Sequence, residues 1–247
     1  MQHHKIVSRE DWLVARKGLL QKEKAFTRQR DEISRKRREM PWVKVEETYI
    51  FDGPDGKQSL VDLFAGKSQL IVYHFMFDPE WSEGCKSCSL LADHYNSVIV
   101  HLEQRDVTLM TISRAPLKKL LAFRERMGWT FPWVSSLENN FNVDFHVTFT
   151  PEERENGTAY YNYGNVPFPV AEAPGFSVFT RDENDSIFHT YSTYARGLDR
   201  FVGIYHLLDI APKGRDEDAD TYPMEWVRHH DRYNDETFIG SVSGITY

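Results

Sequence analysis

The chain has only two cysteines in 247 residues, which excludes a small scaffold held together by several disulfide bonds. It has no apolar run approaching the about 20 residues needed to cross a membrane, and it does not open with a secretory signal peptide. We therefore expect a protein of the cytoplasm, a reducing compartment, that does not act at a membrane.

Net positive charge is concentrated in one segment of the chain. The net charge is −7, yet residues 16–38 carry ten Lys or Arg and only three Asp or Glu, a local net charge of +7. The remainder of the chain therefore sums to −14. A chain that bound nucleic acid over its whole surface would not carry this net negative charge. We interpret the basic cluster 35–38 as the surface of an exposed helix and expect no nucleic-acid partner.

The two cysteines form a C-x-x-C pair between a predicted strand and a predicted helix. Residues 71–77 are rich in β-branched and aromatic side chains, and apolar residues recur every three or four positions over 91–102. The first turn of a helix offers unpaired N–H groups and the positive end of the dipole, which stabilise a thiolate. Lys86 adds positive charge. We predict that Cys85 is the exposed nucleophile and that Cys88 closes a disulfide with it.

Two residues near the pair are candidates for proton transfer. Glu83 precedes Cys85 by two positions and would raise the thiol pKa if it lay close. His74 lies in the predicted strand, where it either manages a proton or packs beside the strand. Both interpretations of His74 stay open at this point.

A metal site is the main alternative to redox chemistry. Because no second C-x-x-C exists, histidines would have to complete the four ligands that zinc requires. His94 and His101 are two helical turns apart, too far to share a metal without help. The alternative site therefore combines both cysteines with other histidines: Cys85, Cys88, His74, His229 and His230.

A thiol peroxidase is a further alternative. Ser82 places a hydroxyl three residues before Cys85, the spacing at which the peroxiredoxin family has Thr or Ser. That family also has Pro four residues before the hydroxyl, whereas Pro79 is only three before Ser82. The pattern therefore matches incompletely.

The chain begins with a long predicted helix. Ser8 to Asp11 matches a capping box, and Pro41 stops the helix after about Met40. Apolar residues recur every seventh position from Trp12 to Met40, a narrow stripe that hints at a homodimer.

Strands alternate with helices through the middle of the chain, which predicts a mostly parallel sheet covered on both faces. A strand from Pro174 and a second over 187–191 then form an antiparallel pair, followed by a helix over 198–210. We divide the chain into an N-terminal amphipathic helix (1–40), a central domain (41–212) with an aromatic-rich insertion (about 131–173), and a tail (213–247).

This order of elements resembles the thioredoxin fold, and the sequence is similar to the DUF899 family of thioredoxin-like proteins. The resemblance rests on six stretches: Phe51–Gly56, Leu70–Phe77, Glu83–Cys88, Arg124–Trp129, His189–Gly197 and Trp226–His230. It implies a thioredoxin-like three-layer α/β sandwich. It also implies that Pro174 occupies the place of the superfamily's cis-proline and shapes the substrate cleft.

The cysteine pair and the resemblance together predict a thiol–disulfide oxidoreductase that needs no cofactor. Its partners would be a disulfide or other oxidised substrate and a thiol reductant. The identity of the substrate does not follow from the sequence.

Overall fold

The computed structural model describes residues 4–234 and divides the chain into two units, one ending at Pro41 and one beginning at Trp42. The first unit consists mainly of α1 (Arg9–Arg38). The side chain of Ser8 caps α1 by accepting a hydrogen bond from the N–H of Asp11 at 3.1 Å, as predicted. None of the 30 residues of α1 is buried.

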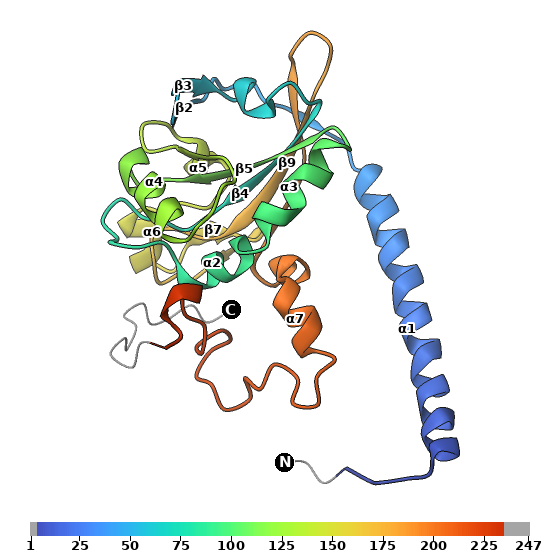
Figure 1. Cartoon of the computed structure of the whole chain (residues 1–247). Coiled ribbons are helices and arrows are strands. Elements are labelled where there is room, and N and C mark those ends of the chain that lie inside the picture. Colours follow the sequence, from blue (N-terminus) through green and yellow to red (C-terminus); the bar gives the residue numbers. More distant parts are fainter. Residues whose placement is uncertain (1–3, 235–247) are drawn as a thin grey trace. The chain divides into compact units, whose positions relative to one another are not determined.

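An eight-stranded sheet forms the centre of the second unit (Figure 1). The strand order is β1-β10-β9-β4-β5-β6-β2-β3. In chain order the strands of this sheet are β1 (Val43–Lys44), β2 (Ile50–Gly53), β3 (Gly56–Ser59), β4 (Gln69–His74), β5 (Val107–Ser113), β6 (Trp133–Ser135), β9 (Gly175–Arg181) and β10 (Ile187–Tyr194). A separate hairpin is formed by β7 (Ala159–Tyr161) and β8 (Gly164–Val166).

The sheet is mixed, so the prediction of a mostly parallel sheet is wrong. Only β4–β5 and β5–β6 are parallel among the described pairs, because the β2–β3 and β9–β10 hairpins add antiparallel strands at both sides. The middle strands β10-β9-β4-β5, with the cysteine pair following β4, have the arrangement of the thioredoxin fold. This confirms the predicted fold class.

Two of the predicted helices are divided into shorter pieces. The helices of this unit are α2 (Lys86–Ala92), α3 (Tyr95–Glu103), α4 (Leu117–Arg126), α5 (Phe141–Asp144), α6 (Pro151–Glu155) and α7 (Gly203–Leu208), with 3-10 turns η1 (Asp62–Phe64), η2 (Ala195–Phe201) and η3 (His230–Arg232). The single helix predicted after the cysteines is broken at Asp93–His94. The predicted final helix is divided into η2 and α7.

Successive side chains of β4 lie on opposite faces of the sheet, and each face packs into its own hydrophobic core. Tyr73 faces a core formed with α2, α3, α4 and α7, to which Leu91 and Phe123 contribute. Val72 faces the other core, formed with η1 and α5, to which Phe141 contributes. The cysteines lie on the Tyr73 side. In the described part of the chain, no helix combines the length and apolar character needed to span a bilayer.

Candidate active site

A tightly packed glycine positions the start of the cysteine pair. A Cβ atom on Gly84 would lie 2.6 Å from Cε1 of Phe75 and 2.9 Å from Cε1 of Phe123. Cys85 follows as the N-cap of α2, and its N–H donates to the carbonyl of Met76 at 3.0 Å. Cys85 is thus held against the segment that continues from β4.

The two thiols have opposite electrostatic environments. Cys85 is partly exposed, and its pKa is lowered to about 7, mainly because the Cys88 side chain hydrogen-bonds to its thiolate. Backbone N–H groups of Cys88 and Ser87 and the charge of Lys86 stabilise the thiolate further. Cys88 is buried, and burial raises its pKa well above the ordinary value, as does the neighbouring Cys85 thiolate. This asymmetry suits Cys85 to attack a substrate and Cys88 to attack the sulfur of Cys85 in a second step.

This asymmetry predicts the pH dependence of alkylation. The rate at which iodoacetamide modifies Cys85 is expected to rise with pH around a midpoint of about 7 rather than 9.0, because only the thiolate reacts. Replacing Cys88 with alanine removes the main hydrogen bond and should raise the midpoint. Mass spectrometry of the modified peptide measures the rate at each pH. An unchanged midpoint in Cys88→Ala would contradict this origin of the shift.

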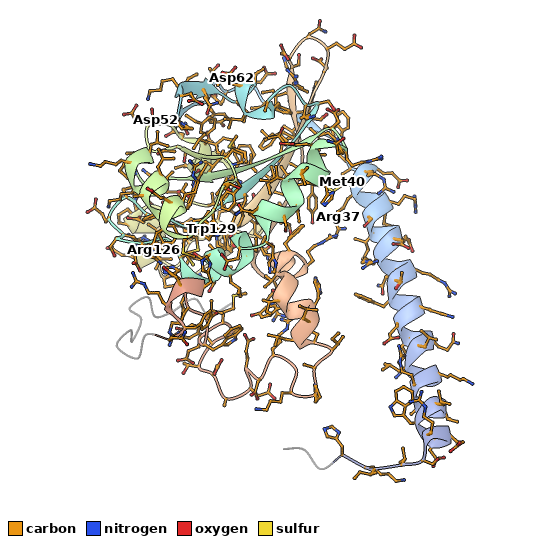
Figure 2. All side chains as sticks on the ribbon, in the orientation of Figure 1. Arg37, Met40, Asp52, Asp62, Arg126 and Trp129 are labelled. Atoms are coloured by element: carbon orange, nitrogen blue, oxygen red, sulfur yellow. The ribbon has the colours of Figure 1, made fainter. Side chains whose placement is uncertain are left out.

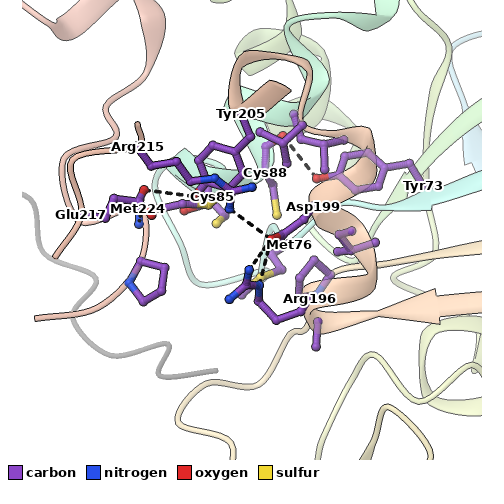
Figure 3. A pocket seen from close by; sticks show the side chains of 17 residues that line it. Tyr73, Met76, Cys85, Cys88, Arg196, Asp199, Tyr205, Arg215, Glu217 and Met224 are labelled. Carbon is purple, nitrogen blue, oxygen red and sulfur yellow. Dashed lines mark hydrogen bonds and ion pairs between the residues drawn. The ribbon is translucent and has the colours of Figure 1, made fainter. Parts of the chain in front are cut away.

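A small cavity lies beside the thiols (Figure 3). Its volume is about 60 Å³, and Cys85, Cys88 and Tyr73 line one side of it. The Tyr73 hydroxyl donates to the carbonyl of Cys88 at 3.2 Å. The cavity is far smaller than the about 300 Å³ of a pocket for a drug-sized ligand. It can therefore hold only a small group next to Cys85.

Charged residues from the loop after α7 also line the cavity. Arg215 stacks over the ring of Tyr205 at 3.7 Å and forms an ion pair with Asp199 at 3.2 Å. The Oε1 atom of Glu217 accepts hydrogen bonds from the Tyr205 hydroxyl and from Nε1 of Trp226. Sequence reasoning missed this part of the lining, because a charged stretch after a helix is typical of an ordinary surface loop.

Residues 225–232, here called the tail strap, bind the backbone next to Cys85. Nε2 of His229 donates to the carbonyl of Gly84 at 2.8 Å. Nδ1 of His229 accepts from Arg126, labelled in Figure 2, at 2.8 Å, which fixes the neutral tautomer. Burial lowers the pKa of His229, and the charge of Arg126 lowers it further.

Further polar contacts hold the tail strap along α2. Lys86, between the two cysteines, donates to the carbonyl of Glu225 at 2.8 Å. His230 contacts Asp93, just beyond the end of α2, at 2.7 Å. The strap therefore spans the whole helix that carries the cysteine pair.

Glu83 belongs to an ion-pair cluster and not to the cavity. Its carboxylate pairs with Arg126 at 2.6 Å and with Arg232 at 2.7 Å. It does not line the cavity beside Cys85. The structure thus places Glu83 as an anchor for the tail strap rather than beside the thiol.

The structure does not bring His74 to the cysteines. Its ring stacks on Phe141 and Phe145 in the other core, and Nε2 lies 2.8 Å from Oγ of Ser177. Burial, with a smaller effect from His189, lowers its pKa to about 3. Of the two interpretations of His74, the structure favours the packed side chain.

Pro174 lies at the cavity, whereas Ser82 does not. Pro174 lines the cavity, although the peptide bond before it is trans, so the expectation of a cis bond is wrong. Ser82 is exposed and lies outside the cavity lining. The hydroxyl expected for a peroxidase site is therefore not in the cavity.

The predicted cysteine–histidine metal site is not assembled. Among residues 4–234, no three His, Cys, Asp or Glu side chains lie close enough together to hold a metal ion. His229 is engaged with Gly84, His230 with Asp93, and His74 lies in the other core.

Comparison with known proteins identifies one family. A family model described as "Bacterial protein of unknown function (DUF899)" matches residues 1–233. A search of curated proteins finds no match.

Several solved structures are distantly similar. The peroxidoxin BcpB of Mycobacterium tuberculosis is 12% identical, with a TM-score of 0.44, and the match covers 66% of this chain and 94% of that one. A mutant of PrxQ from Xylella fastidiosa is 16% identical, with a TM-score of 0.41 over 64% and 88% of the two chains. A mutant of peroxiredoxin Q from Xanthomonas campestris is 14% identical, with a TM-score of 0.42 over 64% and 90%.

Proposed function

The chain belongs to the DUF899 family, and we propose that it is a thiol-based oxidoreductase in which Cys85 attacks the substrate and Cys88 completes the reaction. One observation carries this proposal: Cys85 is the partly exposed N-cap of α2, and the buried Cys88 one turn further on lines the same cavity. The lowered pKa of Cys85 and the raised pKa of Cys88 agree with this placement. A nucleophile that is a thiolate near neutral pH, with a protonated thiol in hydrogen-bond reach, is the arrangement that thiol–disulfide exchange needs.

The reaction with a disulfide proceeds in two exchanges. The Cys85 thiolate attacks one sulfur atom, forming a mixed disulfide, and the other half of the substrate leaves as a thiolate that takes a proton from water. Cys88 then attacks Sγ of Cys85 and gives its proton to the second leaving thiolate. The substrate gains two electrons, and the Cys85–Cys88 disulfide that forms must be reduced by a thiol reductant.

The cavity favours small substrates. About 60 Å³ beside Cys85 accommodates a few non-hydrogen atoms, and the loop that carries Arg215 and Glu217 forms one wall. We therefore infer that the substrate presents a small or protruding oxidised group.

The same small cavity supports a second candidate, a thiol peroxidase. The Cys85 thiolate would attack the terminal oxygen of a hydroperoxide and form a sulfenic acid, and the O–O bond would break. The leaving alkoxide or hydroxide would take a proton from water and depart as alcohol or water. Cys88 would then attack the resulting sulfenic acid, forming the disulfide and releasing water. The exposed Ser82 does not support this candidate, because its hydroxyl lies outside the cavity.

A trapping experiment with Cys88→Ser distinguishes the two candidates. In this variant the first product on Cys85 cannot be resolved, so it should accumulate. Reduced, metal-free protein is mixed with either hydroxyethyl disulfide or hydrogen peroxide, and the mass of the Cys85 peptide is followed over time. Faster formation of the mixed disulfide supports the exchange reaction, whereas faster formation of sulfenic acid supports the peroxidase. If neither reagent reacts faster with Cys85 than with free cysteine, both candidates are wrong.

A further inference from the structure

Four sulfur atoms belong to residues that line one cavity. The thiols come from Cys85 and Cys88 on α2, and the thioethers come from Met76 after β4 and Met224 in the loop after α7 (Figure 3). All four side chains are at least partly buried. Thiolates and thioethers are soft ligands, and the two together suit a soft metal ion.

Met224 is held at the cavity by an unusual backbone conformation. Its φ is +68°, a left-handed value that residues with side chains rarely adopt and that is often found at functional sites. Its N–H donates to Glu217 at 3.1 Å, and its carbonyl accepts from the N–H of Val227 at 3.1 Å. These bonds fix the segment that carries the thioether, and Met224 is only 8% exposed.

The oxygen ligands in the lining are already engaged. Asp199 forms ion pairs with Arg196 at 2.7 Å and Arg215 at 3.2 Å. Oε1 of Glu217 accepts from three donors, including the N–H of Met224. No histidine is among the described residues that line the cavity. Sulfur therefore remains as the available ligand, which disfavours hard cations and zinc sites of the usual Cys and His composition.

We propose that Cys85, Cys88, Met76 and Met224 form a binding site for Cu(I). Binding exchanges two thiol protons for one copper ion, forming Cu–S bonds to both cysteines, and no electrons are transferred. The bound thiolates leave one net negative charge, which Lys86 beside Cys85 partly balances. The thioethers complete the coordination as neutral ligands.

This inference does not rest on the proposed function, although it uses the same thiols. A Cys85–Cys88 disulfide has no thiolate left to bind copper, so the oxidised protein should not bind Cu(I). Conversely, bound Cu(I) should protect both thiols from alkylation. Metal binding and thiol oxidation are thus two separately measurable properties.

The test is a competition between the protein and a Cu(I) chelator. Reduced full-length protein is titrated anaerobically with Cu(I) in the presence of bathocuproine disulfonate, and X-ray absorption gives the number of sulfur neighbours. We expect one Cu(I) per chain with more than two sulfur neighbours. Met76→Leu and Met224→Leu should each weaken binding at least about tenfold, as is common when a metal site loses a supporting group. Zn(II) in excess should not displace the copper.

Met127→Leu is the matched control. Met127 is buried in the same hydrophobic core as Met76 but does not line the cavity, so this change should leave the affinity for copper unaltered. If the buried Met76→Leu variant does not fold, the Met224→Leu variant, whose change lies in a loop, tests whether thioethers bind the copper. No binding, or binding with two sulfur neighbours and an affinity independent of both methionines, overturns the site. The trapping experiment is done without metal, so its failure is distinguishable from the failure of copper binding.

Discussion

Replacing Cys85 with serine is expected to lower turnover of any disulfide or peroxide substrate by at least about a thousandfold, because a hydroxyl cannot replace a thiolate as nucleophile. The lowered pKa of Cys85 favours the reactive thiolate near neutral pH. A serine hydroxyl stays protonated at this pH and cannot form the mixed disulfide. Substrate-dependent consumption of a thiol reductant measures the loss.

Cys88→Ser serves as the matched control for this substitution. It changes the same atom type one helical turn away but leaves Cys85 in place, so the first exchange should still occur while complete turnover stops. The two variants therefore differ in whether a product accumulates on the protein. Accumulation in Cys85→Ser and not in Cys88→Ser would show that the roles are reversed.

The second large effect is expected from Gly84→Ala. The new methyl group would lie 2.6 Å from the ring of Phe75 and 2.9 Å from that of Phe123, distances that force the backbone or the rings to move. Overpacking of this kind lowers the free energy of unfolding by about 1–3 kcal/mol. The carbonyl of Gly84 also accepts the bond from His229, so a backbone shift would loosen the tail strap as well. Urea unfolding of the reduced protein measures the change.

Gly164→Ala is the control for this prediction. Gly164 lies in β8, its φ is not in the left-handed region, and an added Cβ would meet no atom within 4 Å. Its free energy of unfolding should therefore change little. Equal stability of the two variants would mean that the rings beside Gly84 adjust without cost.

The cysteine pair and its fold were predictable because their signals are local. The β-branched run before Cys85 and the apolar spacing after Cys88 are both visible within about a dozen residues, and they specify a strand followed by a helix. The side on which each strand residue lies is not local information. Alternation puts Tyr73 and His74 on opposite faces, but both faces are buried, so the sequence did not reveal which of the two faces the cysteines share.

The rest of the site depends on contacts between distant segments. Glu217 and Met224 occur in a stretch with no regular pattern, and their place beside the thiols results from how the loop after α7 folds back. Glu83 appeared to be a neighbour of the thiol because only two positions separate it from Cys85. Its arginine partners, Arg126 and Arg232, lie 43 and 149 residues away in the sequence and determine where its carboxylate points.

The tail strap has a consequence for how the protein is made. Gly84 and His229 are 145 residues apart, and a ribosome adding about 5–20 residues per second needs roughly 7 to 30 s to bridge that interval. During this time the nascent chain already contains both thiols, while the segment that will cover α2 has not been synthesised. Each new molecule therefore passes through a stage in which both thiols are present but the tail strap is not yet bound to Gly84.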